Sequence, residues 1–398
     1  MLGGGQLVRV AARVRVDAYK ARIADNAQIT PDASGFFQAS PEEAGEMDRR
    51  GETSEERSAR ERIRPFIDPV VQFESRHINS VPTLEEAETM LRPIEQLLAV
   101  LESTGEPELP EKLKNTLIAS LALACSKIAT VPTLDCGTDL GKAVTRVLLL
   151  AATNRYPEAK PDELAEFDKG EGIGGWGYSR VAAAEGLLAL ASKTRCTDAP
   201  VIERLDVLVK DRSAHVRYRI ANHACEIRST QPDKMWEWIE LLAKDESINV
   251  RKACVHSLDR LANLAATRSM SLMTQILDDV PSNREGSDSL ARKTVKAFAG
   301  WYVVRNEPTA KAALENLIAN IRNRAKQALS LPAVLRDLLT QGDMDDSGTP
   351  SIVRGRAIEL LKSLSSQSCN IVRDLLDGDG QTQSTSGDEE PVIQSLLN

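Results

Sequence analysis

A short motif occurs twice in this chain at a fixed distance. The segments KDRSAHVR, beginning at Lys210, and KDESINVR, beginning at Lys244, share the pattern Lys-Asp-x-Ser-x-x-Val-Arg at an offset of 34 residues. Self-similarity at such a period is typical of stacked supersecondary units, each of which cannot bury its apolar face alone. The motif therefore predicts a repeat architecture rather than a single globular core.

The segments around the motif carry helical patterns. Apolar residues recur at helical spacing, the intervening loops are short, and no strand-like alternation lies between them. The content of 42% hydrophobic and 4% aromatic residues suits close-packed helices better than sheets. We expect an all-α fold, an α-solenoid of stacked antiparallel helix pairs. The expected helices lie at about 83–104, 111–129, 138–152, 179–193, 199–210, 213–228, 232–244, 247–263, 267–278, 289–304, 308–329 and 351–365.

Changes in polarity and the placing of Pro and Gly divide the chain into segments. Thr83 followed by Glu86 predicts a capping box at a helix start, and Pro93 should kink or break that helix. Residues 154–178 are expected to form a loop that contains Pro and Gly. The expected segments are a linker or disordered segment at 1–64, a helical segment at 65–178 that can also be read as degenerate repeats, repeats at 179–330, a helical cap at 331–373 and an acidic disordered tail at 374–398.

The repeated motif resembles HEAT repeats. In that family an Asp in the loop between helix pairs is followed six residues later by an Arg in the next helix. Asp211 with Arg217, and Asp245 with Arg251, match this spacing. The resemblance implies that these side chains bond along the stack from one repeat to the next. Arg180, in SRVAAAEGLL, looks like an earlier copy of the same position whose Asp is missing.

A second resemblance concerns the segment EFDKGEGIGGWGYSRVAAAEGLLALA at 166–191. It is similar to the helical-repeat tails of bacterial STAND-type multidomain proteins. That resemblance implies a sensor or scaffold portion that lacks its ATPase, since the chain has no Walker motif.

Several short motifs imitate chemical sites without the context that such sites need. The GxGxxG pattern at 172–177 follows a charged segment, whereas a dinucleotide site needs a preceding strand. The triplets HAC at 223–225 and CVH at 254–256 place their possible ligands two residues apart, on nearly opposite sides of a helix. No Cys–His or Ser–His–Asp arrangement has supporting context. We therefore expect no catalytic residue, no cofactor and no metal, in a chain that is not an enzyme.

The cysteines and the lengths of the apolar runs indicate where in the cell the protein is expected. Six cysteines without a CxxC pair are expected to be reduced, mostly buried thiols of a cytoplasmic protein. No uninterrupted apolar run reaches 18 residues, so we expect no membrane span. The N-terminal segment, in which Arg9 follows a short apolar start, is not expected to be a secretory signal.

The segment DKMWEWIELL suggests a contact surface for a partner. Trp238 belongs to the expected apolar face, so Trp236 points elsewhere and is a candidate hot spot. The second helix of each expected pair lies beside the second helix of the next. We expect this row of second helices to carry Lys234, Arg204 and Arg268. The alternative is that Trp236 packs against the neighbouring repeat.

Three functions are open at this point. The first is a non-catalytic helical-repeat scaffold or sensor that binds a protein partner. The second is nucleic-acid binding through 174–330, where basic residues outnumber acidic ones by six within a chain of net charge −8. The third is the regulatory portion of a split or multidomain enzyme. The oligomeric state is left open.

Overall fold

The computed structural model describes residues 54–102, 109–155, 163–169, 178–194, 196–281, 284–322, 324–328, 330–342 and 351–378. Every regular element in these residues is a helix, and none is a strand, which confirms the expected all-α class. The chain divides into two units, 1–62 and 63–398, and the description below concerns the second. None of the helices described has the length and apolarity needed to cross a membrane.

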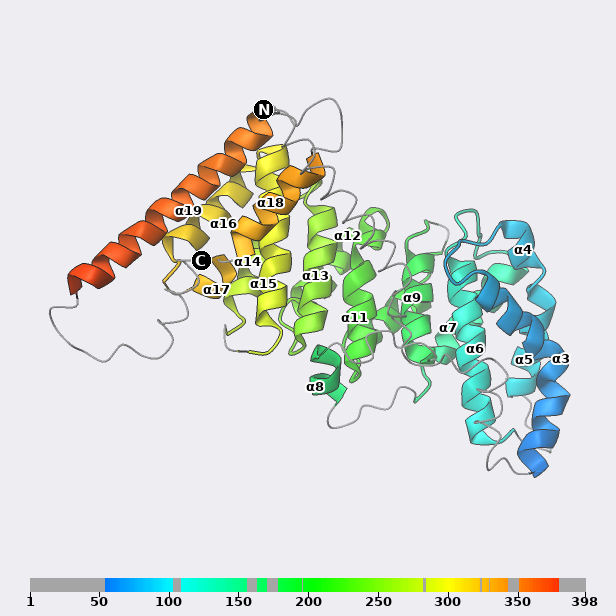
Figure 1. Cartoon of the computed structure of the whole chain (residues 1–398). Coiled ribbons are helices and arrows are strands. Elements are labelled where there is room, and N and C mark those ends of the chain that lie inside the picture. The colour runs from blue at the N-terminus through cyan, green and yellow to red at the C-terminus, as the bar shows by residue number, and fades with distance from the viewer. Residues whose placement is uncertain are drawn as a thin grey trace, which may run out of the picture. The chain divides into compact units, whose positions relative to one another are not determined.

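Most of the expected helices are present (Figure 1). The bounds are α3 Ser54–Arg76, α4 Leu84–Glu88, α5 Leu91–Glu102, α6 Glu111–Ala129, α7 Asp139–Ala151, α8 Glu163–Asp168, α9 Ser179–Ala191, α10 Ala199–Leu208, α11 Ala214–His223, α12 Pro232–Leu242, α13 Ile248–Leu261, α14 Ala266–Asp278, α15 Ser287–Ala299, α16 Pro308–Ala319, α17 Ala325–Ala328, α18 Ser330–Gly342 and α19 Ser351–Gly378. A 3-10 helix, Ala224–Ser229, extends α11, and a π-helix, Gly300–Val304, extends α15.

The capping box at α4 is confirmed. The Glu86 backbone N–H donates to the Thr83 hydroxyl, and the Glu86 carboxylate accepts from the Thr83 backbone N–H at 2.8 Å. The expected break occurs between α4 and α5, just before Pro93. Pro93 therefore lies in the first turn of α5, where its missing N–H leaves no helical hydrogen bond unmade.

The helix expected at 308–329 is divided into α16 and α17, and the larger differences from expectation are at α3, α8 and α19. α3 begins at Ser54 rather than near Pro65, because the charged stretch that precedes Pro65 is rich in Glu and Arg, which have high helix propensity. α8 lies inside the expected loop at 154–178. α19 is much longer than the expected 351–365 and runs to Gly378; residues 379–398 of the expected tail lie outside the described residues, as do 1–53.

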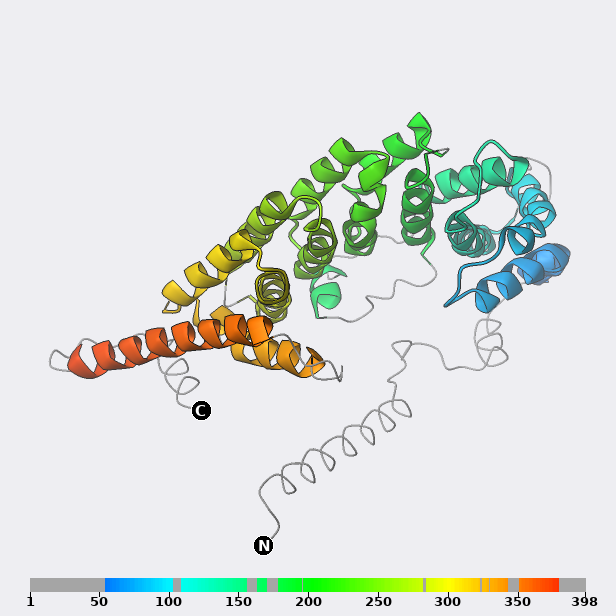
Figure 2. The ribbon, with the colours of Figure 1, turned by 90° about the horizontal axis from the view of Figure 1, so that it is seen from above.

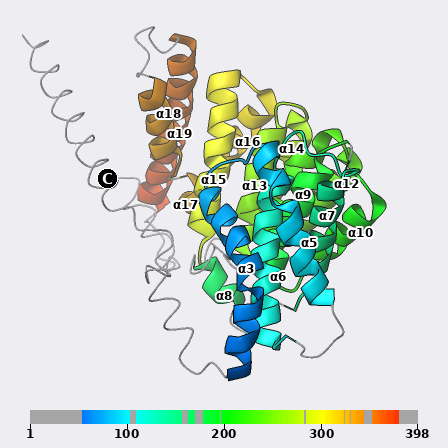
Figure 3. The same ribbon diagram turned by 90° about the vertical axis from the view of Figure 1, so that its right-hand side faces the viewer.

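The helices α9, α11, α13 and α15, here called the first helices, pack side by side. α11 lies between α9 and α13, and α13 contacts both α11 and α15. The helices α10, α12, α14 and α16 are here called the second helices. Of these, α10, α14 and α16 pack on α9, α13 and α15 respectively, and α12 packs on the 3-10 helix after α11. Figure 2 shows the first helices almost end-on beneath the row of second helices. At the C-terminal end, α18 packs on α15 and α19 packs on α16 (Figure 3).

A disulfide joins two loops at the N-terminal side of this packing. Cys136, before α7, and Cys196, after α9, are bonded with their Cα atoms 5.3 Å apart. The prediction that all six cysteines are reduced is therefore wrong for these two. Disulfides persist mainly in oxidising compartments, so the cysteines no longer support the expected cytoplasmic location. Cys125, Cys225 and Cys254 are free and buried, and Cys369 is free and exposed.

Helices α6, α7 and α9 approach one another closely at Gly186. A Cβ at this position would lie 2.7 Å from Leu148 Cδ2 and 3.0 Å from Ser126 Cα. Gly186→Ala is expected to lower the free energy of unfolding by about 1–3 kcal/mol, because overpacking forces close-packed neighbours to move. Gly355→Ala, in α19, is the matched control. Nothing lies within 4 Å of a Cβ at this position, so the higher helix propensity of Ala should raise the free energy of unfolding by up to about 1 kcal/mol. Urea denaturation measures both, and equal effects of the two variants would contradict this packing.

Candidate partner-binding surfaces

Two arginines link successive first helices. Arg180, at the start of α9, pairs with Asp211 through Nε at 2.8 Å and NH2 at 3.1 Å. Arg217, in α11, pairs with Asp245 in the same way at 2.6 and 3.1 Å. Each arginine thus reaches the aspartate before the next first helix, and Arg180 needs no aspartate in its own loop. Bidentate pairs of this kind fix the spacing and orientation of neighbouring helices.

The series of pairs ends at Arg251. Its Nε donates to the Asp245 backbone carbonyl at 2.5 Å, and its buried Nη1 atom has no hydrogen-bond partner among the described residues. Burial lowers the pKa of Arg251, and the charge of Asp279, which lies 34 residues after Asp245, opposes that shift. Asp279 is the third aspartate in the register, and sequence analysis missed it because no matching arginine follows it.

A second series of ion pairs joins the second helices. Lys234 pairs with Asp206 at 2.9 Å, and Arg268 pairs with Glu240 at 2.6 Å. Both partners of the second pair lie 34 residues after those of the first. Trp238 also donates its Nε1–H to Asp206 at 2.7 Å. Lys234 and Arg268, expected as partner contacts, therefore connect neighbouring second helices.

Trp236 is half-buried rather than fully exposed. The Arg268 guanidinium lies 4.3 Å from the centre of its ring, a cation–π contact with the next second helix. Arg204 is half-buried on α10. Val207 on α10 is 57% exposed and Leu241 on α12 is 42% exposed, again 34 residues apart. The assignment of this face as a partner contact stays a prediction.

The segment α8 lies across the N-terminal ends of α11 and α13, and sequence analysis missed this. The Asp168 carboxylate accepts from the Ser247 hydroxyl at 2.6 Å and from the backbone N–H groups of Ile248 and Asn249, both at 3.2 Å. Arg284 lies 3.4 Å from the same carboxylate. An acidic side chain from far along the chain thus caps α13, where the helix dipole favours negative charge.

The residue before Asp168 fills an aromatic pocket. The Phe167 ring is fully buried, with its centroid 4.6 Å from that of His215 and 5.7 Å from that of Tyr218. The Asn249 side-chain amide, itself buried, donates to the Phe167 backbone carbonyl. Phe167 and Asp168 are therefore held through a ring, a carbonyl and a carboxylate, by residues of α11, α13, the turn before α13 and the loop before α15.

Half-buried basic side chains lie beside this site on α13 and α15. Lys252, His256 and Lys293 are half-buried, and Lys252 Nζ donates to Ser289 Oγ at 2.9 Å. Burial, and then the charge of Lys252, hold the pKa of Lys293 below its usual value. The pKa of His256 is lowered by burial and then by the charge of Lys293. The basic surplus of 174–330 is thus partly concentrated on one face.

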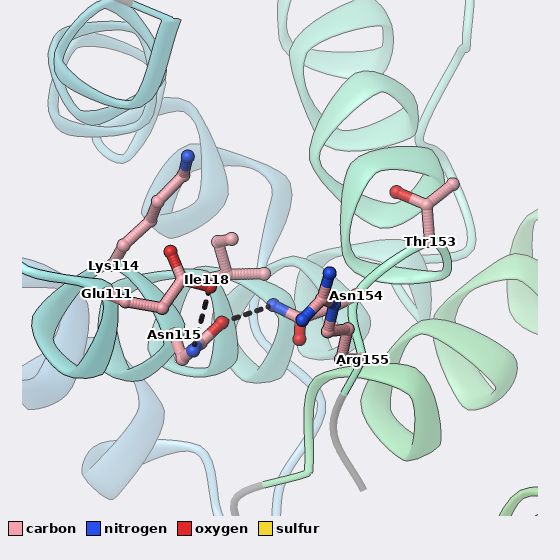
Figure 4. A pocket seen from close by; sticks show the side chains of 7 residues that line it. All are labelled: Glu111, Lys114, Asn115, Ile118, Thr153, Asn154 and Arg155. Atoms are coloured by element: carbon pink, nitrogen blue, oxygen red, sulfur yellow. Dashed lines mark hydrogen bonds between the residues drawn. The ribbon is translucent and has the colours of Figure 1, made fainter. Parts of the chain in front are cut away.

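A shallow hollow of about 400 Å³ opens between α6 and the end of α7 (Figure 4). Its lining is mostly polar, but Asn154 donates to Asn115 at 3.1 Å and Asn115 donates to Glu111 at 3.3 Å. In Figure 4, Lys114 and Arg155 extend from different elements and do not point toward one another. The hollow therefore presents no converging set of charged groups. The lining residues are Glu111, Lys114, Asn115, Ile118, Thr153, Asn154 and Arg155.

The described residues supply few reactive groups. No cluster of three or more His, Cys, Asp or Glu side chains among them could hold a metal ion. Burial raises the pKa of the Cys125, Cys225 and Cys254 thiols, which disfavours the nucleophilic thiolate. His223 bonds Glu226 at 2.9 Å, and Glu226 lies 3.6 Å from Arg260.

No protein-family model matches this sequence, and neither does any curated protein or solved structure.

Proposed function

We propose that this chain is a non-catalytic scaffold or sensor that binds a protein partner. In this proposal, residues 179–330 form a HEAT-like stack of antiparallel helix pairs. The 34-residue offset between the Asp206–Lys234 and Glu240–Arg268 pairs supports it, as does the forward pairing of Arg180 and Arg217. A stack of this kind offers an extended surface rather than an enclosed site, as is typical of repeat proteins.

The observation that carries the proposal is the docking of α8. A short segment of this chain binds the helical stack through a buried aromatic ring and a carboxylate, together with a hydrogen bond to its backbone. These are the contacts by which a protein surface holds a peptide of another chain. The same surface chemistry therefore suits a protein partner.

The test is affinity capture from lysate of the source cells with the full chain as bait. Bound proteins are identified by mass spectrometry with and without nuclease treatment. We expect a defined protein that survives nuclease and whose recovery falls at least tenfold with either Trp236→Ala or Tyr218→Ala. Ile352→Glu, an exposed apolar position on α19, is the matched control and should leave recovery unchanged.

A second candidate is nucleic-acid binding through the half-buried cations on α13 and α15. The charges of Lys252 and Lys293 repel one another, and a phosphate backbone would relieve that repulsion. In this case the captured material disappears with nuclease, and affinity falls steeply as salt is raised. Lys293→Gln would then weaken binding and reduce the salt slope by about one.

A further inference from the structure

The contacts of α8 define a recognition site with three parts. The pocket beside His215 and Tyr218 takes an aromatic ring, and the Asn249 amide takes the carbonyl of that aromatic residue. The start of α13 takes the carboxylate of the next residue. All three parts act on one dipeptide unit, Phe167-Asp168, rather than on the whole of α8.

We propose that this site binds a partner segment in which an aromatic residue is followed by an acidic one, and that α8 is an intramolecular occupant that the segment displaces. This rests on the proposed function, because it names the chemistry of the partner segment that the stack receives. α8 then limits partner binding until a competing segment of the same kind is present.

The site selects its ligand by charge and by shape. Two backbone N–H groups and the Ser247 hydroxyl all donate toward Asp168, so a carboxylate satisfies them and an ammonium group does not. Arg284 adds a positive charge on the same side, and the charge of Asp168 also acts on Lys252. The pocket is closed by two rings, which suits a flat aromatic side chain.

The construction of α8 favours exchange with a competitor. The helix has six residues, and of those whose side chains are described, Phe167 alone is fully buried; Ala165 and Glu166 are exposed. In the part of the chain that the structure describes, the side-chain hydrogen bonds of α8 are those of Asp168. A segment held in this way, within one chain, competes with a free ligand at an effective concentration that can reach the millimolar range. Removing its two anchors therefore opens the site without altering the residues that form it.

The test uses the full chain and a fluorescein-labelled peptide with the sequence of residues 161–170, PDELAEFDKG. Fluorescence anisotropy gives its affinity for the wild-type chain and for the double variant Phe167→Ala with Asp168→Ala. We expect the double variant to bind the peptide at least tenfold more tightly, because the tethered competitor is gone. Adding Tyr218→Ala should reverse that gain, and a peptide with both anchors changed to Ala should bind neither chain.

A second measurement applies if circular dichroism shows that the double variant is unfolded. Hydrogen exchange of the wild-type chain is then recorded with excess peptide. The α8 amides should exchange faster while those of Ile248 and Asn249 stay protected. The inference is overturned if the folded double variant does not bind the peptide, if the Ala peptide binds equally well, or if α8 exchange does not change in the second measurement. None of these results depends on whether the capture experiment finds a partner, so the two proposals fail separately.

Discussion

Arg217→Ala is expected to lower the free energy of unfolding by about 3–5 kcal/mol, the cost of leaving one member of a buried ion pair without its partner. The side chains of Arg217 and Asp245 are only 10% and 6% exposed. Arg217 also donates to the backbone carbonyl of Asp211 at 2.8 Å, so its loss removes bonds to two loops at once. Burial by itself lowers the pKa of Arg217, but the hydrogen bond and charge of Asp245, together with the charges of Glu246 and Asp211, raise it overall.

The control for this prediction is an exposed pair. Arg146 and Glu102 are 2.5 Å apart, as close as the buried pair, but their side chains are 62% and 43% exposed. Arg146→Ala should therefore cost about 1 kcal/mol or less, since solvent screens exposed pairs. Urea denaturation followed by circular dichroism measures both variants. Equal losses in the two would show that the Arg217 pair does not hold the neighbouring helices together.

Reduction of the Cys136–Cys196 disulfide is expected to lower the free energy of unfolding by about 2–4 kcal/mol. The bond joins residues 60 apart in the sequence, and such a link restricts the unfolded chain. The measurement compares urea denaturation with and without dithiothreitol. The Cys136→Ala, Cys196→Ala double variant should be insensitive to the reductant, and Cys369→Ser, at an exposed thiol, should behave as the wild type. A wild-type chain whose stability is unchanged by dithiothreitol would contradict the bond.

Local signals in the sequence account for most of the helices. The capping box at Thr83 and the apolar periodicity from Glu111 onward mark helix positions because these patterns act within a few residues. α8 was not predicted because its apolar content is small. Its main contacts, from Phe167 and Asp168, include residues about 80 positions away that come close only when the chain folds. The disulfide was not predicted for the same reason, since its two cysteines lie 60 residues apart in the sequence.

The functional surfaces were predicted less well than the helices. The 34-residue register located Asp211, Asp245 and Arg217, but the pairing of Arg180 with the aspartate ahead of it needed the three-dimensional stack. Trp236 was singled out because it lies off the apolar face of its predicted helix, whereas Phe167 was not singled out. The available signal at Phe167 was a single aromatic residue within the acidic segment ELAEFD, where solubility alone gives no reason for a ring.

The central claim, that the helical stack binds a protein, is tested most directly by titration calorimetry of the purified chain with the purified protein identified by capture. The titration is run without nucleic acid at two salt concentrations. The account predicts saturable binding whose affinity changes little with salt and falls at least tenfold in Tyr218→Ala or Trp236→Ala. An absence of binding between the purified proteins, or an affinity that depends on added nucleic acid and falls steeply with salt, would contradict it.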